Sequence, residues 1–120
     1  MNNRSFYERI AVHIPCCVSD GKNQYNATIV DMSDDGIHLI LDTDVDKVNV
    51  KSLKYIFLET IVKICNIEDT EMNVSDSFSI EWIDKAKNMI GCAIRDNGKL
   101  SKLVQAIKTA RYCKEMEDKA

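Results

Sequence analysis

A β structure is indicated first by residues 25–41, which read YNATIVDMSDDGIHLIL. Two runs rich in β-branched and other apolar residues, 25–30 and 37–41, flank a polar turn. In this turn, from Asp31 to Gly36, the Asp and Ser side chains can bond nearby backbone N–H groups, and the glycine can take a left-handed conformation. The segment therefore predicts two neighbouring strands joined by a tight polar turn.

The segments on both sides extend the β pattern. Towards the N-terminus, apolar residues alternate at positions 12, 14, 16 and 18, as in a half-buried strand. Several short strands at regular spacing are typical of a barrel or a sandwich. The other β-rich segments, towards the C-terminus, are 53–58, 61–67, 77–83 and 89–94.

The end of the chain changes to a helical period. Apolar residues at positions 100, 103, 104 and 107 are typical of a helix with one apolar face. Asn97 and Gly98 interrupt the preceding strand, and Ser101 is a candidate helix cap. No linker or repeat divides the chain, so we expect a single domain. Its expected parts are a flexible N-terminal arm (1–10), a β-barrel (11–95) and a C-terminal helix (99–118).

The composition is that of an ordinary, mildly acidic globular protein. The 120 residues are 45% apolar and 29% charged, and the formal net charge is −3. A nucleic-acid polymer needs a basic surface for its phosphates, so we expect none as a partner, whereas a local basic cluster can still bind a small anion. No signal peptide and no apolar run of membrane-spanning length is visible, so we expect a cytoplasmic protein that is not embedded in a membrane.

The cysteines and histidines give no basis for a metal site or a catalytic centre. The five cysteines are odd in number and show no C-x-x-C spacing, so we expect reduced thiols, no structural disulfide and no zinc. His13, Cys16 and Cys17 are close in sequence, but on a strand Cys16 faces away from the other two. Three ligands cannot converge from there, and no third group is available to orient a Cys–His pair. We expect buried structural cysteines and no catalytic residue.

The best candidate site combines Arg4 and Arg9 with the turn residues Asp31, Ser33 and Gly36. A guanidinium group binds phosphate oxygens in bidentate fashion and stacks on flat rings. An Asp carboxylate accepts two N–H bonds from a guanine edge, a Ser hydroxyl donates or accepts, and a Gly lets a ligand approach the backbone. Together these residues could hold an anionic purine nucleotide. A capped β-turn beside a solvated arm accounts for the same pattern equally well.

Trp82 has two interpretations. It lies in an alternating segment with Phe78 and Ile80, and the simpler interpretation is a core residue. The alternative is a platform on which a base stacks.

The same motifs give the chain a resemblance to the PilZ domain family. That family has an R-x-x-x-R motif at its N-terminus and a D/N-x-S-x-x-G turn further along. The turn from Asp31 to Gly36 matches the second motif in full, and Arg9 matches the second arginine of the first. Ser5 stands where the family has the other arginine, and Arg4 is one residue further out. The segment 91–94 resembles the family's last strand, with Ile in place of its aromatic residue.

This resemblance implies a mainly β fold, a six-stranded antiparallel β-barrel with a C-terminal α-helix. It also implies a receptor that binds cyclic di-GMP, has no catalytic activity or cofactor, and passes the second-messenger signal to a partner protein. The ligand would be bound by Arg4, Arg9, Asp31, Ser33 and Gly36, with the arm closing over it.

Two alternatives remain. The first is a degenerate member of the family that binds no nucleotide and acts through protein contacts, and the serine at position 5 favours it. The second, more remote, is an enzyme of Cys/His type.

Overall fold

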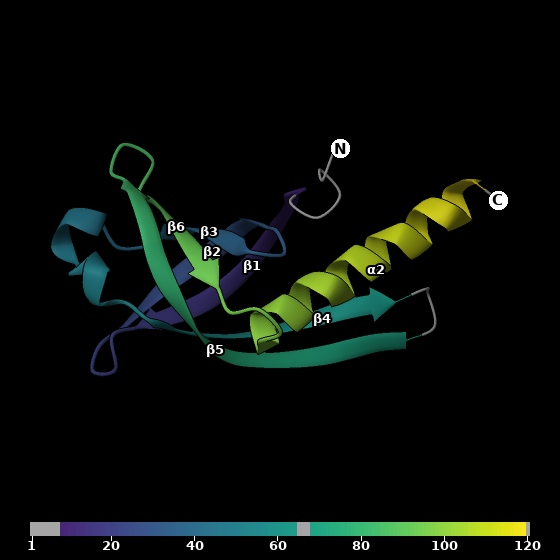
Figure 1. Cartoon of the computed structure of the whole chain (residues 1–120), viewed down its shortest axis with the longest axis horizontal. Helices are drawn as coiled ribbons and strands as arrows, with labels where there is room; N and C mark the ends of the chain where they lie inside the picture. The colour runs from purple at the N-terminus through teal and green to yellow at the C-terminus, as the bar shows by residue number, and fades with distance from the viewer. Residues whose placement is uncertain (1–7, 65–67, 120) are drawn as a thin grey trace.

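Figure 1 shows the computed structural model, which describes residues 8–64 and 68–119. Within these residues, six antiparallel strands close into a barrel in the order β1-β2-β3-β6-β5-β4, and one helix follows. The expected fold class is thus confirmed. The elements are β1 (Ile10–Ser19), β2 (Gln24–Met32), β3 (Gly36–Leu41), the 3-10 turns η1 (Val45–Lys47) and η2 (Val50–Ser52), β4 (Tyr55–Ile64), β5 (Glu68–Asp84), β6 (Met89–Ile94) and α2 (Lys99–Lys119).

The alternation predicted for the first strand is confirmed by burial. Ile14, Cys16 and Val18 are buried, whereas His13 and Pro15, on the opposite face, are exposed. Because successive side chains of a strand point to opposite faces, the apolar set lines the barrel interior. Asp31 on β2 and His38 on β3, which are described below, project from the outer face of the same sheet.

The β4–β5 hairpin is longer than the sequence indicates. A single β4 replaces the two segments expected over 53–58 and 61–67, whose last residues lie outside the described part of the chain. The polar residues 68–76 show no strand pattern, yet they form the first half of β5 because β4 supplies a continuous hydrogen-bonding partner. In Figure 1 this hairpin extends beyond the other strands, with α2 beside it.

Helix α2 closes the barrel with its apolar face. Leu100, Leu103 and Val104 have no exposed surface, so the first turns of the helix are part of the core. The candidate cap Ser101 is the third residue of the helix, and no cap is needed there. The carboxylate of Asp76 on β5 accepts a hydrogen bond from the Leu100 backbone N–H at 3.0 Å. A residue distant in sequence therefore caps the helix.

Asp76 also binds two other groups. Its Oδ1 accepts from the Ser77 backbone N–H at 2.8 Å and from the Arg95 guanidinium at 3.0 and 2.8 Å, and its side chain has no exposed surface. Burial alone would raise the pKa of Asp76, but the bonds from Leu100, Ser77 and Arg95 outweigh burial, so the pKa lies below its usual 3.8. The ionised carboxylate joins β5, the end of β6 and the start of α2.

The cysteines correct one prediction. Cys16, Cys17 and Cys92 are free, but Cys113 on α2 is disulfide-bonded, so the expectation of no disulfide is wrong. An odd cysteine count does not prevent a single bridge, and a bridge depends on two Cα atoms lying within about 7 Å in space, which sequence spacing does not reveal. Burial raises the pKa of Cys16 and of Cys92 to about 12, so neither thiol is a nucleophile at neutral pH.

The described part of the chain offers neither a clustered metal site nor a membrane span. No three His, Cys, Asp or Glu side chains within it are grouped to hold a metal ion. No helix among the described residues has the length and apolar composition needed to cross a membrane.

Candidate functional site

The turn between β2 and β3 is closed by its own polar groups. The Ser33 backbone N–H donates to the Gly36 carbonyl at 2.9 Å, and the Ser33 hydroxyl donates to the Asp35 carboxylate at 2.7 Å. Ser33 is completely buried. The Asp35 carbonyl accepts from the Ile94 backbone N–H at 3.1 Å, which ties the turn to the end of β6. The turn is therefore held to the barrel rim by hydrogen bonds.

Gly36 is required for packing and not for its backbone conformation. The expected left-handed conformation is wrong, because among the described glycines Gly21 is the one with a positive φ, at 101°. A Cβ at Gly36 would instead lie 2.7 Å from the Cys92 carbonyl oxygen. The missing side chain lets β3 pair closely with β6 at this point.

Arg9, the residue that directly precedes β1, binds the turn with its side chain. Its Nε and Nη2 both lie 2.6 Å from Asp31 Oδ1. Its Nη1 donates to the Ser33 hydroxyl at 3.1 Å, and its Nη2 donates to the Gly36 carbonyl at 3.4 Å. Four of the five predicted ligand residues thus form one cluster, while the fifth, Arg4, lies outside the described residues.

A row of side chains continues from this cluster across the outer face of the barrel. Asp31 pairs with His38 on β3, and their side chains are linked, with His38 Nδ1 3.0 Å from Asp31 Oδ2. The His38 ring contacts the Trp82 ring edge to face, with centroids 4.9 Å apart. His38 and Trp82 are neighbours of the predicted site that sequence analysis did not assign to it. His38 on β3 and Trp82 on β5 both pair with Gly91 on β6, and this cross-strand register could have placed them beside the site.

The interpretation of Trp82 as a core residue is wrong. Phe78 on the same strand is buried, but Trp82 is 41% exposed. The strand register shifts between Ile80 and Trp82, as in a β-bulge, which puts an extra residue on one strand and changes the face to which later residues point. The indole therefore lies on the outer face, beside His38.

Gly91 leaves the space in which this indole lies. A Cβ at Gly91 would be 2.1 Å from one indole carbon of Trp82. We expect Gly91→Ala to displace the indole and to destabilise the protein by about 1–2 kcal/mol, the cost of modest overpacking. Because Trp82 is the sole tryptophan of the sequence, its fluorescence emission reports the displacement directly. An unchanged emission spectrum would show that the indole does not rest on Gly91.

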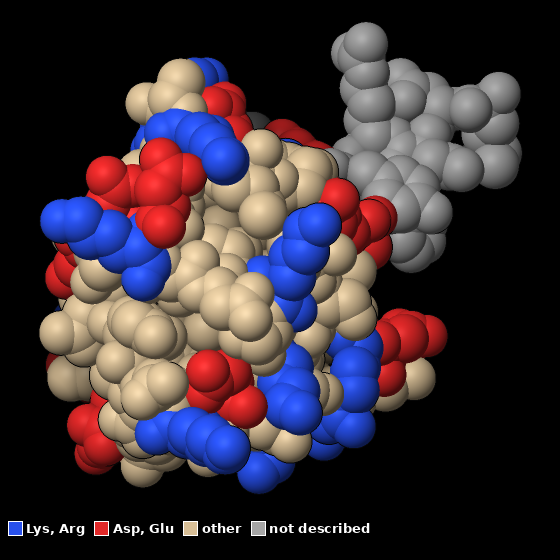
Figure 2. Space-filling view, turned by 90° about the vertical axis from the view of Figure 1, so that its left-hand side faces the viewer, with Lys and Arg blue, Asp and Glu red and all other residues tan. Residues whose placement is uncertain are grey.

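Charge is mixed on one face of the molecule. On the face shown in Figure 2, Lys and Arg side chains are interspersed with Asp and Glu side chains. A polymer of nucleic acid is held by a continuous basic surface, and this face does not provide one.

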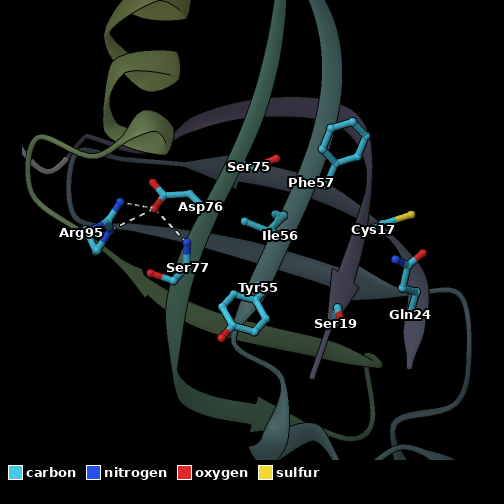
Figure 3. A pocket seen from close by; sticks show the side chains of 10 residues that line it. All are labelled: Cys17, Ser19, Gln24, Tyr55, Ile56, Phe57, Ser75, Asp76, Ser77 and Arg95. Carbon is cyan, nitrogen blue, oxygen red and sulfur yellow. Dashed lines mark hydrogen bonds and ion pairs between the residues drawn. The ribbon is translucent and has the colours of Figure 1, made fainter. Parts of the chain in front are cut away.

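A separate groove of about 460 Å³ lies over β1, β4 and β5 (Figure 3). Its apolar surface comes from the half-exposed rings of Tyr55 and Phe57. Arg95 lies at its edge, where the guanidinium is bound to Asp76. The groove includes none of the predicted ligand residues.

Comparison with protein families matches the PilZ domain to residues 3–96. Because this match covers most of the 120 residues, the chain belongs to the PilZ domain family, a family of cyclic di-GMP receptors whose domains are non-catalytic. No protein of curated function matches the chain. The match ends before α2 begins at Lys99.

Proposed function

We propose that this PilZ domain binds cyclic di-GMP at Arg9, Asp31, Ser33 and Gly36, with Arg4 as a further cation, and passes the signal to a partner protein. The observation that supports the proposal is the cluster in which the Arg9 guanidinium reaches Asp31, Ser33 and Gly36 together. A guanidinium held this way is already positioned for a phosphate, which lowers the ordering cost of binding.

Binding would exchange partners within this cluster. Arg9 binds Asp31 Oδ1, and His38 Nδ1 lies 2.9 Å from the same Oδ1 and 3.0 Å from Oδ2. A guanine edge offers Asp31 two N–H donors in place of Arg9 and His38. A phosphate offers Arg9 anionic oxygens in place of the Asp31 carboxylate. Charged hydrogen bonds are therefore replaced by charged hydrogen bonds. The net affinity comes from contacts that the empty protein lacks, such as those of Arg4 and of the exposed Trp82 surface.

Calorimetric titration with cyclic di-GMP tests the proposal, and cyclic di-AMP is the matched control. Adenine lacks the two adjacent N–H donors that Asp31 would accept, so it would leave the carboxylate without its partners. A site built for a hydrogen bond rejects the analogue that lacks it. We expect heat of binding with the guanine nucleotide and at least tenfold weaker binding of the adenine one. Equal binding of both would remove Asp31 from base recognition.

The alternative function is a degenerate PilZ adaptor that acts through protein contacts alone. The serine at position 5, where the first motif has an arginine, favours it. Absence of binding at millimolar cyclic di-GMP would support this alternative.

Position 5 gives a gain-of-function prediction. Ser5→Arg supplies the missing charged, bidentate donor and is expected to tighten binding by about 1–2 kcal/mol, less than a full charged hydrogen bond because ordering the arm costs entropy. The dissociation constant would then fall roughly fivefold to thirtyfold in the same calorimetric titration.

A double variant separates the contributions of the two neighbouring positions. If Arg4 already substitutes for the missing arginine, Arg4→Ala with Ser5→Arg should bind about as well as the parent. If Arg4 is idle, the double variant should bind as tightly as Ser5→Arg alone. A Ser5→Arg protein no tighter than the parent would mean either that Arg4 already fills the gap or that the arm does not reach the ligand, and Arg4→Ala alone separates these cases because it weakens binding only in the first.

A further inference from the structure

One side chain of the motif turn points to the C-terminal helix and not to Arg9. The Asp34 carboxylate accepts a hydrogen bond from Lys108 Nζ at 3.0 Å and another from the Gln105 side-chain amide. The side chains of Asp34 and Lys108 are 24% and 21% exposed, so this ion pair is largely shielded from water. A shielded pair is screened less by salt than a surface pair.

The same helix face also contacts the other segment that carries a ligand residue. The Arg111 guanidinium donates to the backbone carbonyl of Ala11, two residues after Arg9. Helix α2 thus holds both the turn and the start of β1 by polar contacts. These contacts come from the middle of α2, beyond the buried Leu100, Leu103 and Val104.

We propose that Lys108 and Gln105 are positioning residues of the nucleotide site, and that α2 is coupled through Asp34 to the occupancy of that site. This inference rests on the proposed function, and it concerns a helix that lies beyond the residues matched to the family.

The electrostatic reason is the number of carboxylates around the site. Asp31, Asp34 and Asp35 lie within the turn segment that would receive a doubly anionic ligand. Arg9 neutralises Asp31, and Lys108 neutralises Asp34. Without Lys108, the uncompensated Asp34 carboxylate would repel the phosphates. The lysine therefore favours binding without touching the ligand.

Coupling between two sites is reciprocal. If α2 in its docked position favours the nucleotide, then the nucleotide must favour the docked helix by the same factor. A partner that binds the docked α2 would bind the occupied receptor more tightly, and a partner that needs α2 displaced would bind the empty one.

The first test needs no nucleotide. In Lys108→Met, which keeps the aliphatic stem, we expect amide hydrogen exchange at Ser33 and Ile94 to be roughly fivefold faster, as for the loss of one partly buried ion pair. These amides close the turn by bonding Gly36 and Asp35. The matched control is Lys102→Met, which removes the same charge from an exposed position of the same helix. Equal exchange in the two variants would overturn the positioning role.

The second test measures affinity for cyclic di-GMP by calorimetry. We expect Lys108→Met to bind roughly fivefold more weakly than the parent, with Lys102→Met unchanged and Lys108→Arg close to the parent. Adding Asp34→Asn to Lys108→Met should restore most of the loss, because a neutral Asn needs no cation. A purely structural role for Lys108 predicts no such rescue, so absence of rescue would refute the electrostatic mechanism.

The third readout is amide exchange along α2 with and without cyclic di-GMP. We expect slower exchange over residues 103–111 in the bound parent, and a smaller change in Asp34→Asn. An unchanged helix in a protein that binds the nucleotide would refute the coupling. If the parent binds no nucleotide, the proposed receptor function fails, whereas the exchange comparison in the empty protein still decides whether Lys108 holds the turn.

Discussion

Replacement of Arg9 by alanine is expected to weaken cyclic di-GMP binding by about 1.5–3 kcal/mol, the range for a hydrogen bond to a charged group. This corresponds to roughly tenfold to over a hundredfold in the dissociation constant. Among the described residues, the guanidinium is the one group that reaches Asp31, Ser33 and Gly36 at once. Its loss removes the group that would bind the phosphate and leaves the Asp31 charge uncompensated beside an anionic nucleotide. Calorimetry of the variant at fixed salt measures the effect.

Arg9→Lys is the matched control for charge. Lysine keeps one positive charge but cannot form the planar, bidentate contact, so we expect an intermediate affinity. Lys22→Ala, at an exposed site in the β1–β2 turn, removes a cation far from the cluster and should leave binding unchanged. An Arg9→Ala protein that binds as tightly as the parent would exclude Arg9 from the site.

The parts of this structure that the sequence predicts are those set by local pattern. The alternation from Val12 to Val18 identifies a strand with one buried face, and the helical spacing from Leu100 to Ile107 identifies the helix face that enters the core. The Asp31–Gly36 motif identifies the turn because its polar groups bond within a few residues.

The remaining features depend on contacts between residues distant in sequence. The alternation of the sequence places Trp82 on the wrong face, because a bulge on β5 changes the alternation and the bulge is defined by its pairing with β6. Asp34 and Lys108 are 74 residues apart, so their ion pair appears only when α2 docks beside the turn. Asp31 and His38 meet because β2 and β3 pair in one particular register.

The helix cap is the clearest case of such a distant contact. Local rules search for a capping side chain within the first turn and select Ser101. The group that caps the helix, Asp76, lies 24 residues before Leu100 on a strand. Gly98 permits this approach, since a Cβ there would be 2.7 Å from Asp76 Oδ2. The stability of the helix is therefore linked to a single buried carboxylate.

Asp76→Asn is expected to destabilise the protein by about 3 kcal/mol, because charge-assisted hydrogen bonds from two backbone N–H groups and a guanidinium are lost or weakened. Urea denaturation at neutral pH measures this free energy of unfolding. Asp20→Asn is the matched control. Asp20 also accepts two backbone N–H bonds, but it lies on the exposed β1–β2 turn, so its replacement should cost far less.

The pH dependence separates the charge of Asp76 from its shape. Its pKa is lower in the folded protein than in the unfolded chain, so its contribution is complete above the unfolded value of 3.8 and is lost as the pH falls through the folded value. The difference in unfolding free energy between the parent and Asp76→Asn should accordingly be constant near neutrality and shrink in acid below that value. A difference that stays constant down to the acid limit of folding would mean that the loss comes from altered packing, and that the ionised carboxylate does not hold β5 to α2.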